Sequence, residues 1–276
     1  MTFDPSLLAA LADVALAAGR VVNEVRAGAF AVLRKADASP VTVADEWAER
    51  LILTELARLM PGVPVVAEEQ VAAGSAPPRL GERFVLVDPL DGTREFVSRN
   101  GEFTVNIAVI EDGRPVAGVV HAPALGEIHV GAVGLGAKEG RIGEDGSVDW
   151  RDIAVRAVPG EGMTILSSRS HGDARTEALI ARLAPARSLA AGSSLKFCRL
   201  ASGAADLYPR LGRTMEWDTA AGDAVLRAAG GLVVDLDGRP LVYGRPAAEG
   251  AVVFANPPFL AAGSRAALDA AAAALG

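Results

Sequence analysis

The chain has 276 residues, of which 50% are hydrophobic and 22% charged, and its formal net charge is −7. This composition predicts a folded protein with one large domain or two closely packed ones. The negative charge argues against nucleic acid or an anionic membrane as partner, because both need a basic face. It allows a phosphorylated small molecule, provided that cations offset the repulsion.

The single cysteine, Cys198, excludes an internal disulfide and suits a reducing cytosol. Asp4 and Asp13 lie near the N-terminus, where a signal peptide would carry a cationic start. No apolar run reaches the ~18 residues that a membrane span needs. We therefore expect a cytoplasmic protein without a membrane span. The sequence does not indicate an oligomeric state.

The first part of the chain predicts two helices followed by strands. Apolar residues recur at helical spacing over 5–25, and a second helix is predicted over 42–60, where Pro61-Gly62 ends it. Short apolar segments bounded by turns predict strands at 63–67, 84–87, 103–110, 115–121 and 128–132.

From about residue 158, short strands alternate with helices, which is typical of an α/β arrangement. The predicted strands are 163–167, 231–236 and 251–255, and the predicted helices are 173–183, 195–202, 218–229 and 260–275. We therefore expect an α+β subdomain over residues 1–155 and an α/β subdomain over residues 156–276.

The apolar strand at 84–87 runs directly into Asp88-Pro89-Leu90-Asp91-Gly92-Thr93. Pro89 removes an amide donor and Gly92 permits tight backbone geometry, so the chain must turn sharply. Such a turn can aim both carboxylates and the Leu90 carbonyl at one point, a ligand set that suits Mg²⁺. A helical turn starting at Gly92 would also present N–H groups to a phosphate. The alternative is a surface turn whose aspartates cap the backbone.

Other acidic residues have two interpretations each. Glu68 and Glu69 follow an apolar strand and are either a solvated edge or a ligand pair. Asp218 opens a predicted helix, either as an N-cap or as a ligand. Asp45 lies in the first turn of the second helix, where its charge either stabilises the helix dipole or takes part in chemistry.

Four segments, in this order, resemble motifs of the inositol monophosphatase superfamily. They are Ser39-Pro40-Val41-Thr42-x-Ala44-Asp45, Glu68-Glu69, the 88–93 segment and Trp217-Asp218-x-Ala220-Ala221-Gly222. Stretches 93–96, 99–107, 192–198 and 205–210 favour the 3'(2'),5'-bisphosphate nucleotidases of sulfate assimilation. The resemblance implies an α+β fold, a layered αβαβα sandwich of the inositol monophosphatase/fructose bisphosphatase type. It also implies hydrolysis of adenosine 3',5'-bisphosphate to AMP and phosphate, with sensitivity to lithium.

The resemblance further implies a cluster of two or three Mg²⁺ ions. Glu68, Asp88 and the Leu90 carbonyl would hold one ion, and Asp88, Asp91 and Asp218 a second. Asp45 and Thr93 would orient and deprotonate the attacking water, and Glu68 is counted with them as catalytic. The subdomain over residues 1–155 would then bind the metals, and the subdomain over 156–276 would supply Asp218 and the substrate pocket. One departure is Ala67, where many relatives carry glycine or serine, but its side chain is not a ligand.

A nucleotide with two phosphates needs a second anion site away from the metals. Lys196 and Arg210 are the candidates, with the Ser193 hydroxyl, because the matching positions in the nucleotidases contact the substrate. The substrate-binding residues that we predict are Asp91, Gly92, Thr93, Arg94, His171, Ser193, Lys196, Arg210 and Asp218. Two alternatives stay open: an inositol- or sugar-phosphate phosphatase with the same metal site, and a non-catalytic binding protein on this scaffold.

Overall fold

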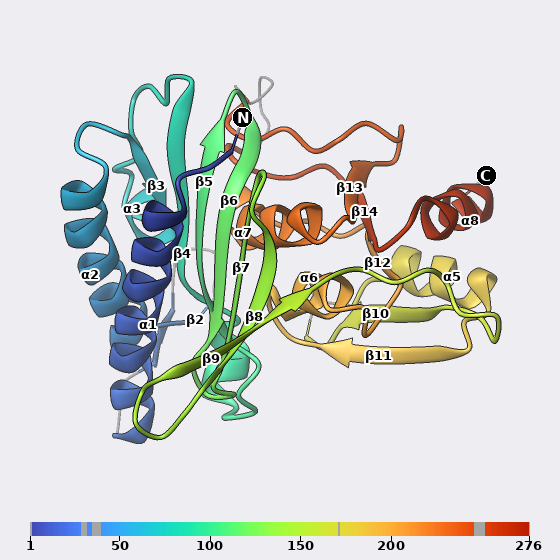
Figure 1. Ribbon diagram of the computed structural model, residues 1–276, viewed down its shortest axis with the longest axis horizontal. Coiled ribbons are helices and arrows are strands. Elements are labelled where there is room, and N and C mark those ends of the chain that lie inside the picture. Colours follow the sequence, from blue (N-terminus) through green and yellow to red (C-terminus); the bar gives the residue numbers. More distant parts are fainter. Residues whose placement is uncertain (1, 29–31, 35–39, 171, 246–251, 276) are drawn as a thin grey trace.

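The computed structural model describes residues 2–28, 32–34, 40–170, 172–245 and 252–275, which stack in five alternating layers of helix and sheet (Figure 1). The first layer holds α1 (Pro5–Ala27) and α2 (Val43–Leu59), which cover one face of a seven-stranded sheet. Its strands in spatial order are β3 (Val65–Ala67), β4 (Arg83–Asp91), β5 (Thr104–Glu111), β6 (Arg114–Ala122), β7 (Glu127–Ala132), β8 (Gly136–Ile142) and β9 (Val148–Ile153).

The third layer consists of α6 (Leu195–Ala201) and α7 (Glu216–Ala228), which lie between the two sheets. The second sheet has the order β11 (Arg187–Ala191), β10 (Thr164–Ser168), β12 (Leu207–Arg210), β14 (Phe259–Ala262) and β13 (Leu232–Asp235). The outer layer holds α5 (Ala174–Leu183) and α8 (Arg265–Leu275). This is the αβαβα sandwich that the motifs imply.

Three short features complete the fold. The strands β1 (Val32–Arg34) and β2 (Pro40–Thr42) pair as an antiparallel ribbon ahead of α2. The helices α3 (Glu68–Ala72) and α4 (Thr93–Val97) directly follow β3 and β4. Both short helices therefore begin at the strand ends where the acidic motifs lie.

The position of α7 depends on two glycines of the first sheet. A Cβ atom added to Gly118 on β6 would lie 2.4 Å from the Ala221 carbonyl oxygen, and one on Gly131 of β7 would lie 2.7 Å from the Val225 Cα. Real Cβ atoms do not approach that closely, so only glycine lets the helix backbone rest directly on the sheet. This contact brings the start of α7, with Asp218, toward the end of β4.

Two predicted elements near the C-terminus are wrong. The described part of the expected 251–255 strand, 252–255, forms a turn with one isolated bridge at Ala255. Residues 260–262, the first three of the expected last helix, instead belong to β14, which pairs with both β12 and β13. Pairing on both sides overrides the helix propensity of the alanines, and α8 begins only at Arg265. Strands β1, β2, β9, β11 and β12 were not predicted.

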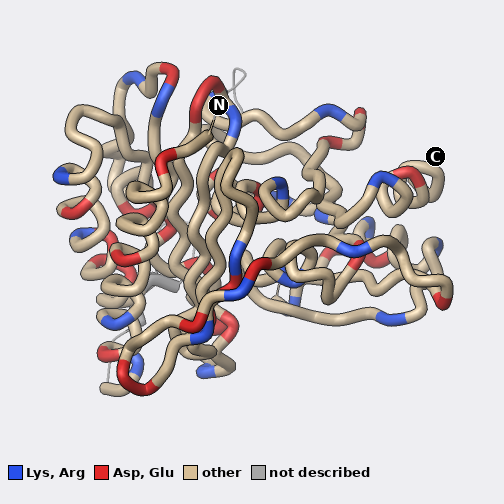
Figure 2. Tube along the Cα trace, in the orientation of Figure 1, with Lys and Arg blue, Asp and Glu red and all other residues tan. Residues whose placement is uncertain are grey.

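By length and mean hydropathy, α1 would qualify as a membrane span, although it contains no uninterrupted apolar run of the length that a span needs. Here Leu11, Ala15, Ala18 and Val22 are fully buried in the core formed with α2 and the first sheet. A core helix packed on one face accounts for this composition. Acidic and basic positions are interspersed along the chain (Figure 2).

Candidate active site

A bulge at the end of β4 brings two predicted ligands together. Three residues apart in a regular strand, Asp88 and Asp91 would point to opposite faces of the sheet. Asp88 pairs with Asn106 and Asp91 with Thr104, so β4 has one residue more than β5 between these pairs. The extra residue turns both carboxylates to the same side. The Leu90 amide donates to Asp88 Oδ1 at 3.0 Å and fixes the turn.

The third carboxylate comes from the second half of the chain. Asp218 lies at the third residue of α7 and not at its N-cap, because the helix begins at Glu216. Its Oδ2 accepts a hydrogen bond from the Met215 amide at 2.8 Å. One carboxylate oxygen each of Asp88, Asp91 and Asp218 lie within 4.8 Å of one another. We call these three residues the acidic triad.

The electrostatics of the acidic triad favour a bound cation. Burial raises the pKa of Asp91 to about 6, with Glu95 and Glu68 adding repulsion and Lys196 opposing it. Burial also raises the pKa of Asp218 well above its usual range, again with repulsion from Asp91 and Glu68. Like charges cannot all ionise in a buried site without compensation. A divalent cation with carboxylate ligands provides that compensation, and the all-oxygen donor set fits Mg²⁺.

Glu68 and the Leu90 carbonyl lie beside the acidic triad. Glu68 is the first residue of α3 and is not one of the three residues whose oxygens converge, yet its charge raises the pKa values of Asp91 and Asp218. The Leu90 carbonyl accepts a hydrogen bond from Thr93 Oγ1 at 3.3 Å. The Glu69 amide donates to Glu49 Oε2 at 2.8 Å, which ties the start of α3 to α2.

Asp45 caps helix α2 with one carboxylate oxygen and faces Thr93 with the other. Its Oδ2 accepts hydrogen bonds from the amide and the hydroxyl of Thr42, at 2.7 and 2.8 Å, and so caps α2. Its Oδ1 accepts from Thr93 Oγ1 at 3.4 Å. One oxygen therefore holds the helix end, and the other faces the threonine at the start of α4.

A basic cavity of about 130 Å³ adjoins the acidic triad and is lined by Asp91 and Asp218 as well as by Ser193, Lys196 and Arg210. Both cationic side chains are buried, with relative exposures of 4% for Lys196 and 8% for Arg210. Burial and the Arg210 charge lower the pKa of Lys196 to about 8, while Asp91 and Glu95 oppose the shift. The lysine therefore remains mostly protonated at neutral pH.

The other predicted substrate residues are placed as follows. Gly92 lines the basic cavity with a φ of 88°, in the left-handed region that favours glycine. Ser193 has a φ of 42°, and its buried Oγ has no hydrogen-bond partner among the described residues. Arg94 is exposed, is not among the residues that line this cavity, and donates to the Ser170 carbonyl at 3.3 Å. His171 lies outside the described residues.

Two polar residues behind the acidic triad were not predicted as site residues. Asn106 Nδ2 donates to Ser194 Oγ at 3.0 Å and to Asp91 Oδ2 at 3.5 Å. Ser194 Oγ donates to the Asp218 carbonyl at 2.6 Å. They link Asp91 on β4 to Asp218 on α7. The sequence contained one indication of such a role for Asn106, because it is a polar residue within the otherwise apolar strand segment 105–110.

Residues 5–273 match the sequence model of the inositol monophosphatase family, so the chain belongs to that family. It is 44% identical over 239 residues to the Escherichia coli K12 protein named 3'(2'),5'-bisphosphate nucleotidase CysQ, covering 86% of this chain and 94% of that protein. The corresponding Aggregatibacter actinomycetemcomitans protein, with the same name, is 33% identical over 258 residues, 92% of this chain and 91% of that protein.

Solved structures support the same grouping. CysQ from Bacteroides thetaiotaomicron has a TM-score of 0.78 and 33% identity, covering 95% of this chain and 99% of that chain. The inositol monophosphatase from Anabaena (Nostoc) sp. PCC 7120 has a TM-score of 0.75 and 25% identity, covering 98% and 95%. These comparisons confirm the predicted family and fold.

Proposed function

We propose that this protein is a magnesium-dependent 3'(2'),5'-bisphosphate nucleotidase that hydrolyses adenosine 3',5'-bisphosphate to AMP and phosphate. The observation that carries the proposal is the acidic triad beside a cavity with two buried cations, Lys196 and Arg210. Hydrolysis of a substrate with a single phosphate requires the metal site alone. A bisphosphate also needs a cationic site for its second phosphate, and guanidinium and ammonium groups are suited to that task.

In this proposal the acidic triad, with Glu68 and the Leu90 carbonyl, holds two or three Mg²⁺ ions. Bound Mg²⁺ would lower the pKa of a water molecule and stabilise the charge on the leaving oxygen. The carboxylates of Asp91 and Asp218, whose pKa values are raised in the free protein, would then be ionised and fixed as ligands.

Thr93 and Asp45 form a route for the proton of the attacking water. Thr93 Oγ1 lies 3.3 Å from the Leu90 carbonyl oxygen and 3.4 Å from Asp45 Oδ1. The hydroxyl would accept the proton of the water while donating its own to Asp45 Oδ1. Asp45 can act as this base without moving, because its other oxygen is fixed by Thr42.

The substrate would span the two parts of the site. The 3'-phosphate would lie at the acidic triad near Gly92 and Thr93, and the 5'-phosphate would meet Lys196, Arg210 and the Ser193 hydroxyl. We also propose Arg94 and His171 as contacts to the nucleoside side of the substrate. The reaction would take place in the cytoplasm as part of sulfate assimilation, without nucleic acid as partner.

The test is phosphate release with Mg²⁺, and with EDTA as control, from adenosine 3',5'-bisphosphate, adenosine 3'-monophosphate and inositol 1-phosphate. We expect kcat/KM to be at least about tenfold higher for the bisphosphate than for either monophosphate, since one charge-assisted contact is worth about 1.5–3 kcal/mol. Preference for inositol 1-phosphate would support the inositol-phosphatase alternative. Absence of phosphate release from all three would favour a non-catalytic binding protein.

A further inference from the structure

One peptide group connects the buried lysine to a carboxylate in the other half of the chain. Lys196 Nζ donates to the Ser193 carbonyl at 2.5 Å and to the Ala191 carbonyl at 3.3 Å. The Gly192 amide donates to Glu102 Oε2 at 2.7 Å. A trans peptide is planar and its C=O and N–H point in opposite directions. The carbonyl of the Ala191–Gly192 peptide therefore accepts a hydrogen bond from the Lys196 ammonium. On its opposite side, the amide of the same peptide donates a hydrogen bond to the Glu102 carboxylate.

This arrangement leaves Lys196 prepared for an anion. An ammonium group has three N–H donors. Two of them are directed at loop carbonyls, the ammonium also lies 5.2 Å from the centroid of the Tyr208 ring, and the side chain lines the basic cavity. Rotation of the Ala191–Gly192 peptide would remove one of the two carbonyl acceptors, and the lysine would lose its fixed position.

Glu102 is itself fixed by Arg169. The guanidinium binds both carboxylate oxygens, with Nε–Oε2 at 2.6 Å and Nη2–Oε1 at 2.8 Å, and Nη2 also donates to the Ala190 carbonyl at 2.7 Å. Such a two-pronged pair has a defined geometry. The arginine is 43% exposed, so the ion pair alone contributes little to stability. Its evident effect is to orient the carboxylate toward Gly192.

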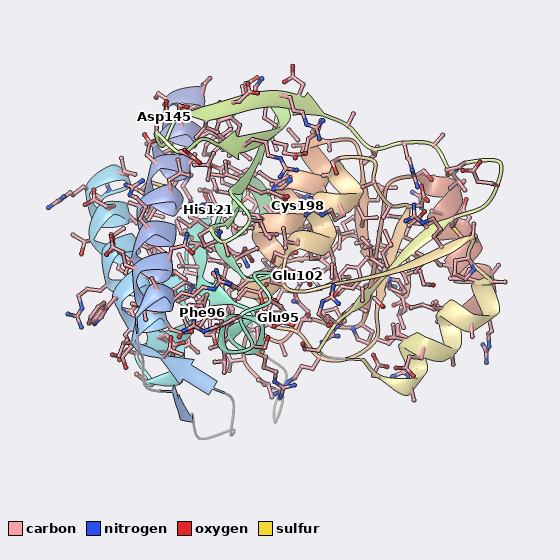
Figure 3. All side chains as sticks on the ribbon, turned by 90° about the horizontal axis from the view of Figure 1, so that it is seen from below. Glu95, Phe96, Glu102, His121, Asp145 and Cys198 are labelled. Carbon is pink, nitrogen blue, oxygen red and sulfur yellow. The ribbon has the colours of Figure 1, made fainter. Side chains whose placement is uncertain are left out.

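Close packing at Gly192 joins this loop to the metal turn. A Cβ atom on Gly192 would lie 2.5 Å from the Glu102 carbonyl oxygen and 2.9 Å from Glu95 Cγ. Glu95 belongs to α4, which begins directly after the Asp91-Gly92 turn, and Figure 3 shows Glu95 and Glu102 close together between the two halves of the molecule. The loop that carries Lys196 thus rests on the segment that leaves the acidic triad.

We propose that Glu102 is a positioning residue. With Arg169 and Gly192 it fixes the Lys196 ammonium at the distance from the acidic triad that a substrate with two phosphates requires. This inference rests on the proposed function. It predicts that Glu102 contributes to selection of the bisphosphate over a monophosphate, although its carboxylate does not touch the substrate.

The experiment measures kcat, KM and the half-saturating Mg²⁺ concentration for adenosine 3',5'-bisphosphate and adenosine 3'-monophosphate. The variants are Glu102→Ala and Glu102→Gln, whose amide oxygen can still accept from Gly192. The matched control is Glu111→Ala, which removes the ion pair with Arg83 at the far end of β5. Melting temperatures of all variants show whether the fold is kept.

For Glu102→Ala we expect KM for the bisphosphate to rise about tenfold, the loss of one oriented charge contact, with kcat and the Mg²⁺ requirement little changed. KM for the monophosphate should stay within about twofold, and Glu102→Gln should recover part of the loss. Equal losses on both substrates, or an unchanged KM for the bisphosphate, would overturn the inference. If the wild-type protein itself does not prefer the bisphosphate, the proposed function fails instead. Should Glu102→Ala not fold, a rise in KM for the bisphosphate alone in Glu102→Gln decides the question.

Discussion

Replacing Lys196 by methionine separates the two halves of the proposed site. Methionine fills a similar volume without the charge, so the change removes the ammonium from the basic cavity while leaving the acidic triad in place. A charge-assisted hydrogen bond contributes about 1.5–3 kcal/mol, so kcat/KM for adenosine 3',5'-bisphosphate should fall roughly ten- to a hundredfold. Adenosine 3'-monophosphate, which has no 5'-phosphate, should lose about threefold at most.

The pH dependence provides a second measure of the same lysine. Burial lowers the pKa of Lys196 to about 8, so the free protein carries the charge below that pH and loses it above. From pH 7 to pH 9, KM for the bisphosphate should rise in the wild-type protein by about tenfold at most. The same rise should be absent in Lys196→Met.

The melting temperature of Lys196→Met serves as the control for an intact fold. The lowered pKa means that burying the charged lysine costs on the order of 3 kcal/mol of folding free energy at pH 7. Its removal offsets the loss of the hydrogen bonds to the Ala191 and Ser193 carbonyls, each worth about 1 kcal/mol. We therefore expect the melting temperature not to fall. A parallel loss of activity on both substrates with a lower melting temperature would refute the reasoning, because Lys196 would then support the fold.

Three further predictions concern the metal site and the core. Asp91→Asn should reduce turnover at least about a hundredfold with the fold intact, because it removes a ligand charge from the acidic triad; near wild-type kcat at saturating Mg²⁺ would exclude Asp91 as a ligand. LiCl should inhibit phosphate release more than NaCl at equal ionic strength, because a small cation can enter a carboxylate site, and equal responses to the two salts would contradict this. Burial lowers the pKa of His121, whose Nδ1 lies 2.8 Å from the Ala15 carbonyl oxygen, to about 4. As the pH falls, His121 is protonated in the unfolded chain at a higher pH than in the folded protein. Its contribution to the free energy of unfolding, about 3 kcal/mol, should therefore be fully present above pH 6.5 and lost as the pH falls to 4. In denaturant titrations His121→Gln should weaken this pH dependence, whereas an unchanged slope would show that His121 does not cause it.

The acidic motif was predictable because its chemistry is local. An apolar strand followed by Asp-Pro-Leu-Asp-Gly-Thr contains both candidate ligands and the residues that shape the turn, and in the structure the short helix α4 follows it directly. The sequence also indicated α1, α2 and most strands of the first sheet, whose hydrophobic patterns are regular. The family followed from the order of the motifs along the chain.

The shape of the strand end was less predictable. A bulge of one residue decides that Asp88 and Asp91 face the same side, and it depends on pairing with β5. Similarly, β14 exists because strands β12 and β13 lie on both sides of an alanine-containing segment. Local propensity pointed to a helix there, and non-local pairing prevailed.

The sequence by itself determined which residues are candidates for the chemistry, since the carboxylates and cations are set by residue type and local context. Only the tertiary structure decided that Asp218 meets the β4 carboxylates, because this requires α7 to rest on Gly118 and Gly131. It also decided that Lys196 is buried and held through Gly192 by Glu102. These contacts join segments about a hundred residues apart, and their geometry follows from the packing of layers, which no local pattern encodes.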